Sequence, residues 1–173
     1  PRYRSPSALA DAADETVSEL TAQALRGLEG VPTRRQAERL RTAVSRHINN
    51  KGLSTGFASA TETAKSKAGD CSEHAVLLVA MLRSAGIPAR GATGLVYVEG
   101  YQGAPHAFGW HMWTQALVDG VWVDLDATLP RAYDAAHLLT ATTPLDGATM
   151  DRDISGLLQL MGDLDITIRE EGS

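Results

Sequence analysis

A start signal for a buried α-helix stands directly before the only cysteine of this 173-residue chain. Asp70 can cap the helix, and Glu73 follows three residues later, which is the spacing of a capping box. Apolar residues then fill most positions up to Leu82, and Gly86–Pro88 ends the pattern. We therefore predict a helix that begins at Cys71 and has a wide apolar face to bury.

Two more helices are predicted ahead of this one. Apolar residues recur at helical spacing over residues 8–28 and again over residues 33–50, where Thr33 is the candidate N-cap. Residues 51–69 are rich in Gly, Ser, Thr and Ala and carry few large apolar side chains. We predict a loop there, with no more than a short turn of helix.

Strand-like runs follow the cysteine helix. They cover residues 91–98, 110–118 and 121–125, and Asp119-Gly120 between the last two is a hairpin signal. We predict a loop over residues 99–109. Because helices come first and an antiparallel sheet second, the predicted fold class is α+β.

The chain is short enough for one domain of ordinary size. Its tail is predicted to hold a strand near 137–142, a helix near 154–161 and a last strand near 164–168. We divide this domain into an N-terminal helical segment (1–52), a core (53–130) and a strand–helix–strand extension (131–173).

Composition excludes some functions. Hydrophobic residues make up 43% of the chain, and the net charge is -5 with no basic stripe, which argues against nucleic acid as a partner. No apolar run approaches the ~20 residues of a membrane-spanning helix. The chain begins at Pro1 without a methionine, so we expect a piece of a longer protein. Its compartment stays open, with export or a periplasmic location allowed, and so does its oligomeric state.

The single cysteine cannot form an intramolecular disulfide, so Cys71 is a buried thiol, a metal ligand or a nucleophile. A nucleophilic thiol needs help to lose its proton, either from the positive end of a helix or from a neighbouring imidazole held by a third group. His111 lies near the start of the predicted strand 110–118, and Asp126 lies just past the end of its hairpin partner. These positions share one end of the hairpin, so we expect the two side chains to meet there and the cysteine helix to point at them.

Four motifs in this order resemble those of the transglutaminase-like superfamily of papain-like cysteine enzymes. They are Gly69-Asp70-Cys71 at a helix start, Leu82–Arg90 (LRSAGIPAR) between helix and strand, His111-Met112-Trp113 on a strand, and Asp126-Ala127-Thr128 after the next strand. The G-D-C-x-E-H-A form is similar to that of bacterial members, and Ala127 stands where proline is commoner. The resemblance covers about residues 53–130 and makes that segment the expected catalytic core.

The resemblance implies a papain-like core, with the nucleophile helix packed on an antiparallel sheet. It implies Cys71 as nucleophile, His111 as general base and acid, and Asp126 as the residue that orients His111. The reaction would be acyl transfer on an amide of a protein or peptide through a thioester, as in a protease, an amidase or a transglutaminase. No cofactor or metal is expected.

The oxyanion-hole side chain is not identified, and Asn49, Asn50 and Gly56-Phe57 are unranked candidates. We hypothesise that residues 99–109 border the substrate cleft and that Tyr101, Gln102 and Phe108 set specificity.

Other interpretations remain open at this point. Asp124 is a rival to Asp126, and the D-x-T match favours Asp126. Cys71 and His74 have C-x-x-H spacing, so Cys71, His74, His111 and Asp126 could form a zinc site instead. The fold could also serve as a catalytically silent binding module. His106 and His137 are interpreted as loop and strand-edge residues.

Overall fold

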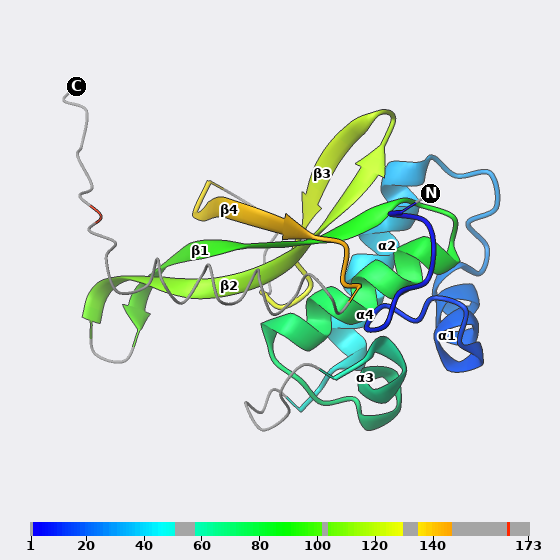
Figure 1. Ribbon diagram of the computed structural model, residues 1–173, viewed down its shortest axis with the longest axis horizontal. Helices are drawn as coiled ribbons and strands as arrows, with labels where there is room; N and C mark the ends of the chain where they lie inside the picture. The colour runs from blue at the N-terminus through cyan, green and yellow to red at the C-terminus, as the bar shows by residue number, and fades with distance from the viewer. Residues whose placement is uncertain (1, 51–57, 102–103, 130–134, 147–165, 167–173) are drawn as a thin grey trace.

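The computed structural model describes residues 2–50, 58–101, 104–129, 135–146 and 166. Its helices are α1 (Glu15–Leu25), α2 (Thr33–His47), α3 (Ala60–Ser66) and α4 (Cys71–Ser84). Its strands are β1 (Ala89–Tyr101), β2 (Ala104–Val118), β3 (Val121–Leu125) and β4 (His137–Thr143). Helices precede strands along the chain, so the predicted α+β class is confirmed (Figure 1).

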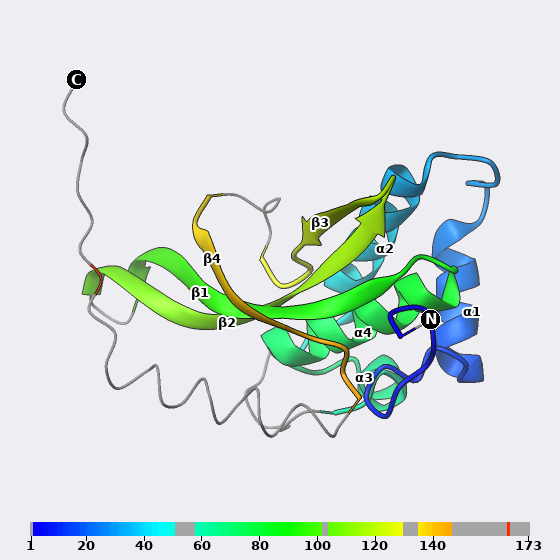
Figure 2. The same ribbon diagram turned by 45° about the horizontal axis from the view of Figure 1, so that its top comes forward.

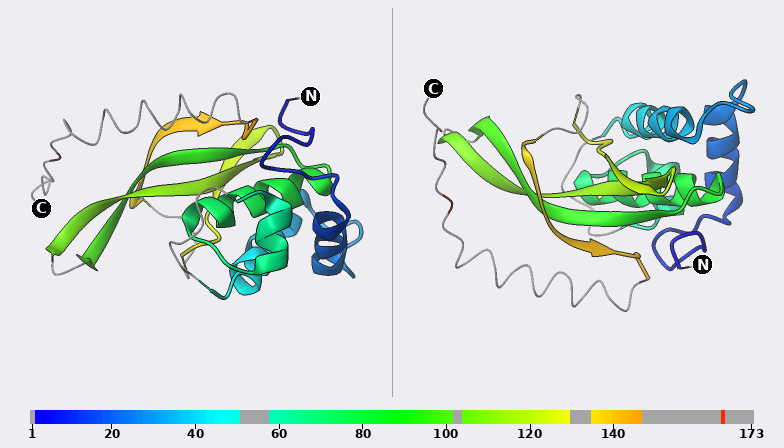
Figure 3. Two further views of the ribbon diagram at one scale, coloured as in Figure 1. Left: turned by 60° about the horizontal axis from the view of Figure 1, so that its bottom comes forward. Right: turned by 90° about the horizontal axis from the view of Figure 1, so that it is seen from above.

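The described strands form one antiparallel sheet in the order β3-β2-β1-β4. The described helices lie on one side of the sheet, as Figure 3 shows, and the far ends of β1 and β2 project beyond them (Figure 2). Helix α4 packs on β1 and β2, and α1, α2 and α3 contact α4 in turn. The predicted packing of the cysteine helix on an antiparallel sheet is therefore present.

Helix α4 is the centre of the core. Every residue from Glu73 to Leu82 is buried, because the sheet covers one side of the helix and the other helices cover the rest. The predicted capping box is confirmed: the carboxylate of Asp70 accepts from the backbone N–H of Ser72, and that of Glu73 accepts from the backbone N–H of Asp70.

Arg83 anchors the C-terminal end of α4. Its buried guanidinium donates to the carbonyl oxygens of Ala89, Pro144 and Ser5, and to the hydroxyl of Ser7. Burial lowers the pKa of Arg83 to about 10, against the raising effect of Asp146. One side chain thus ties the helix to β1, to the segment after β4 and to the N-terminal segment.

The first helix is shorter than predicted. Asp14 caps it by accepting from the N–H of Thr16 at 2.8 Å, so α1 begins at Glu15. The predicted helical residues before it take part in other contacts, since the carbonyl of Leu9 accepts from the N–H of Ala60 at the start of α3.

The second and third helices also differ from the prediction. Thr33 is the first residue of α2, and Pro32 occupies the N-cap position. The predicted loop 51–69 contains α3, which a capping box of Ser59 and Glu62 fixes. Residues 51–57 lie outside the described part of the chain.

The predicted loop over residues 99–109 is wrong. β1 and β2 continue to Tyr101 and from Ala104, and their outer ends pair across the hairpin. Tyr97 contacts the rings of Phe108 and His106 across the strands, which explains why this segment pairs despite its glycines and proline. Whether the segment borders a substrate cleft stays a prediction.

The remaining strands agree with the sequence. Asp119 and Gly120 both have positive φ, 51° and 82°, as the predicted hairpin turn between β2 and β3 requires. β4 confirms the predicted strand near 137–142. The predicted helix 154–161 and strand 164–168 lie outside the described residues, apart from Ile166.

Candidate active site

The turn before α4 is built around Gly69. Its φ is +155°, and a Cβ atom added there would lie 2.2 Å from the Cβ of Glu73. The buried carboxylate of Glu73 accepts from the N–H groups of Asp70 and Ala58, at 2.9 and 3.1 Å. The backbone that presents Cys71 is therefore fixed by a residue that has no room for a side chain and by a carboxylate beneath it.

Cys71 is the first residue of α4 and is half-buried. Burial raises the pKa of its thiol to about 11, and hydrogen bonding with the backbone of Met112 offsets only part of that effect. The negative charges of Asp70 and Asp126 raise the pKa further. Of the two sources of help named for the thiol, the backbone at the helix end does lower its pKa, but burial outweighs that effect and the thiol keeps its proton at neutral pH.

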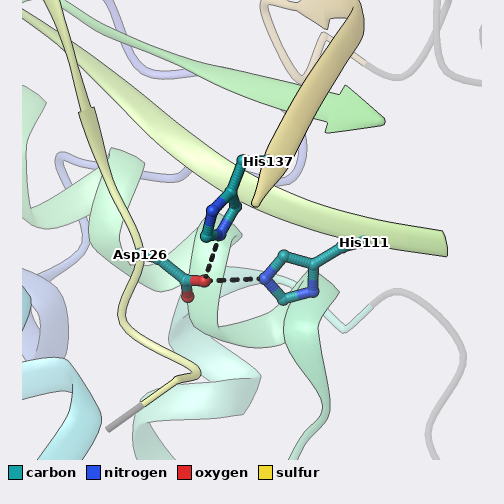
Figure 4. Close-up of side chains that lie close together, drawn as sticks. All are labelled: His111, Asp126 and His137. Carbon is teal, nitrogen blue, oxygen red and sulfur yellow. Dashed lines mark hydrogen bonds and ion pairs between the residues drawn. The ribbon is translucent and has the colours of Figure 1, made fainter. Parts of the chain in front are cut away.

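His111 and Asp126 meet as predicted. The last paired residues of β2 and β3 are Thr114 and Leu125, so Asp126 leaves β3 beside the stretch of β2 that carries His111. The Nε2 atom of His111 lies 2.8 Å from Oδ2 of Asp126, and both side chains are buried (Figure 4). The contact of Cys71 with Met112 places the thiol against the residue that follows His111.

Asp126 is held as an ionised acceptor. Its Oδ1 atom accepts from the N–H groups of Thr128 and Leu129, at 2.7 and 3.3 Å. Burial alone would raise the pKa of this carboxyl group, but the hydrogen bond and charge of His111, the bond from His137 and the N–H of Thr128 hold it well below its usual range.

The structure separates Asp126 from its rival. Asp124 accepts from Nε1 of Trp113 at 2.7 Å and from Nε2 of Gln115 at 2.8 Å. Asp124 thus anchors Trp113, whose ring stacks on that of His111 at 6.1 Å between centroids. The tryptophan of the H-x-W motif is buried and supports the imidazole.

His137 was missed by the sequence analysis. It begins β4, an outer strand of the described sheet, which agrees with its interpretation as a strand-edge residue. Its side chain is nevertheless buried, and its Nε2 atom lies 3.1 Å from Oδ2 of Asp126 (Figure 4). Its ring packs edge-on against Trp113, with 5.3 Å between centroids. The sequence gives no register between β4 and β1, so no signal in it brings residue 137 to the Asp126 carboxylate.

The zinc set that the sequence allowed is not brought together. Nδ1 of His74 lies 2.5 Å from the carbonyl oxygen of Asp70, one turn back in the same helix. Among the described residues, the group whose ligand atoms lie within 4.8 Å of one another is His111, Asp126 and His137. Cys71 and His74 are not part of it.

The structure describes two of the candidate oxyanion-hole residues, Asn49 and Asn50. The carbonyl of Asn50 accepts from the N–H of Gly69 at 3.0 Å, so residue 50 lies beside the turn that leads to Cys71. Asn49 donates its N–H to the carbonyl of Lys67. Gly56 and Phe57 lie outside the described residues.

Comparison with solved structures supports the fold. A protein of Cytophaga hutchinsonii, described as a "putative cysteine protease", matches with a TM-score of 0.71 at 23% identity, over 86% of this chain and 47% of that one. The chain therefore spans about half the length of this relative.

Two further structures match less closely. The periplasmic domain of TgpA from Pseudomonas aeruginosa has a TM-score of 0.48 and 20% identity, over 74% of this chain and 49% of that one. The red sea bream transglutaminase has a TM-score of 0.41 and 14% identity, over 78% of this chain and 28% of that one. A search of curated protein sequences finds no match.

None of the helices that the structure describes has both the length and the apolar composition that a membrane crossing needs. A family model matches residues 19–127, which is more than half of the chain, and it includes α4, the His111 strand and Asp126. The match starts well before the predicted core at residue 53 and takes in α2 and most of α1. The chain belongs to the transglutaminase-like superfamily.

Proposed function

We propose that the chain is a cysteine enzyme that transfers acyl groups from amides through a thioester on Cys71. The observation that carries the proposal is the buried His111–Asp126 pair, because Met112, the residue after His111, forms a backbone hydrogen bond with the Cys71 thiol. The fold and family are those of cysteine-based catalytic domains, which supports this function.

The mechanism starts from a protonated thiol. Because the bond to Asp126 uses Nε2 of His111, Nδ1 is the nitrogen left to accept the thiol proton. In the proposed step, sulfur attacks the amide carbonyl carbon while the S–H proton passes to Nδ1, so no stable thiolate is needed beforehand. Asp126 stabilises the imidazolium that forms.

The second half of the reaction returns that proton. The C–N bond of the tetrahedral intermediate breaks, and Nδ1–H of His111 protonates the leaving amine. The thioester on Cys71 is then attacked by water, which gives hydrolysis, or by a second amine, which gives transamidation. N–H groups at the start of α4, including that of Cys71, are the candidate oxyanion donors, each worth about 10²–10³ in rate.

Paired assays for amide hydrolysis and for primary-amine incorporation test this function. We expect Cys71→Ala to abolish both activities and Asp126→Asn to lower them by about 10²–10⁴-fold. His47→Gln is the matched control, because His47 is a histidine at the end of α2 whose ring bonds to the carbonyl oxygen of Ala64 in α3. Activity that survives in Cys71→Ala would contradict the proposal, and its absence from the wild type across protein, peptide and small amide substrates would favour a binding module.

A further inference from the structure

The proposed mechanism assigns no role to His137. It comes from β4, 11 residues after Asp126 in the chain, and all three side chains are buried together. Figure 4 shows both imidazole rings directed at one oxygen of Asp126, with Nε2 of His111 at 2.8 Å and Nε2 of His137 at 3.1 Å. The proposed mechanism needs only one of these rings.

We propose that His111, Asp126 and His137 form an inhibitory binding site for a divalent transition-metal ion, with zinc as the probe ion. Binding rests on the geometry of the three residues alone, whereas the inhibitory effect rests on the function proposed above.

The spacing of the ligand atoms suits such an ion. Donor atoms at about 2.0–2.1 Å from a tetrahedral zinc ion lie about 3.3–3.5 Å apart. The two nitrogen–oxygen distances, 2.8 and 3.1 Å, are shorter than this, and all three atoms lie within 4.8 Å of one another. Small outward movements of the two rings would admit an ion at the point where both now meet the carboxylate.

The donor set selects the class of ion. Two imidazoles and one carboxylate are a set that zinc accepts in catalytic sites, with a fourth position open to water. Calcium and magnesium prefer oxygen ligands and are disfavoured by the two nitrogens. Zinc would therefore bind here in preference to the abundant alkaline-earth ions.

The surroundings already hold the ligands in place. Oδ1 of Asp126 keeps its two backbone N–H donors while Oδ2 faces the rings. The indole of Trp113 packs against both imidazoles and is itself fixed by Asp124. Hydrogen bonds and packing that orient ligands from outside are a general feature of metal sites.

Binding would block the proposed catalysis through the tautomer of His111. A metal ion takes the lone pair of Nε2, so the ring proton of the neutral imidazole must sit on Nδ1. The nitrogen that would accept the thiol proton of Cys71 would then already carry one. No covalent bond to carbon or sulfur changes, and removing the ion restores the acceptor.

Zinc titration by calorimetry, on metal-free protein, tests the site. We expect one zinc ion per chain, binding at least about 100-fold weaker in His137→Gln and in Asp126→Asn, and unchanged binding in Cys71→Ser and in the control His47→Gln. Unchanged binding in His137→Gln, or its loss in Cys71→Ser, would overturn the proposal.

A second measurement covers the case in which His137→Gln does not fold. In the wild-type protein, zinc should shift the ring nitrogen signals of His111 and His137 among the five histidines, as followed by NMR. Shifts confined to the other three would overturn the proposal. Activity is measured separately in the presence of a chelator, so a chain that binds zinc here but never cleaves an amide would refute the proposed function alone. An active chain that binds no zinc would refute this inference alone.

Discussion

Gly69 fixes the residue-scale geometry of the site, because the turn before Cys71 leaves no space for a side chain. A Cβ atom there would lie 2.2 Å from the Cβ of Glu73, well inside any contact distance. We expect Gly69→Ala to lower the free energy of unfolding by about 2–3 kcal/mol, through overpacking and backbone strain together. Urea unfolding would measure this as a lower midpoint with an unchanged slope.

Gly27→Ala is the matched control for that experiment. Gly27 also has a positive φ, +78°, but nothing lies within 4 Å of its added Cβ. Gly27→Ala should lower the unfolding free energy only through backbone strain, by about 1 kcal/mol. Equal losses in the two variants would mean that the contact with Glu73 has no energetic importance.

The protonation state of the Cys71 thiol also depends on the surroundings of this one residue. Because burial raises the pKa of the thiol to about 11, alkylation by iodoacetamide should be slow at neutral pH and should rise with pH through a midpoint well above ~8.5. The same cysteine in urea-unfolded protein is the control and should show its midpoint near ~8.5. A folded-state midpoint below that of the unfolded chain would show that a preformed thiolate exists.

At the scale of elements, α4 depends on the anchor at its C-terminal end. Arg83→Met would leave the buried carbonyls of Ala89 and Pro144 without their guanidinium donor, so we expect a loss of about 3–5 kcal/mol in unfolding free energy. Arg83→Lys should lie between this variant and the wild type, since an ammonium group cannot reproduce the planar set of donors.

An exposed arginine provides the comparison for Arg83. Arg39 on α2 is exposed and donates to a single carbonyl, that of Ala24. Arg39→Met should lower the unfolding free energy by about 1 kcal/mol or less. Chemical denaturation of the variants side by side would measure the loss in unfolding free energy of each. A loss in Arg83→Met no larger than that in Arg39→Met would contradict the anchoring role.

At the scale of the whole molecule, the ionised Asp126 links stability to pH. Its pKa is lower in the folded chain than in the unfolded one, so its contribution is present above the unfolded value of ~3.9 and is lost as pH falls through the folded value. We expect the stability difference between wild type and Asp126→Asn to shrink steadily as pH falls below ~3.9. Urea unfolding at a series of pH values measures it, and a difference that grows on acidification would contradict the assigned charge state.

Local signals explain which parts of the molecule the sequence predicts. The cap of α4, the Asp119-Gly120 turn and the His111–Asp126 contact each depend on neighbouring residues or on one hairpin, so spacing alone anticipates them. Register between distant strands carries no such signal, and His137 was missed for that reason.

The burial of a side chain also has no local signal in the sequence. The charge at a helix end can be read from the sequence, but the loss of solvent around Cys71, which outweighs it, depends on how β2 packs against α4. The outer half of the β1–β2 hairpin was missed because its aromatic contacts form only once the two strands pair.

The central claim, that Cys71 becomes acylated with help from His111, can be tested most directly without knowing the natural substrate. The measurement is the intact mass of the protein, followed by peptide mapping, at short times after mixing with an activated ester such as p-nitrophenyl acetate. We predict one acyl group on Cys71 that forms at least about 10²-fold faster in the wild type than in His111→Gln and does not form in Cys71→Ala. Acylation of Cys71 at equal rates in wild type and His111→Gln, or acylation only at other residues, would contradict the account.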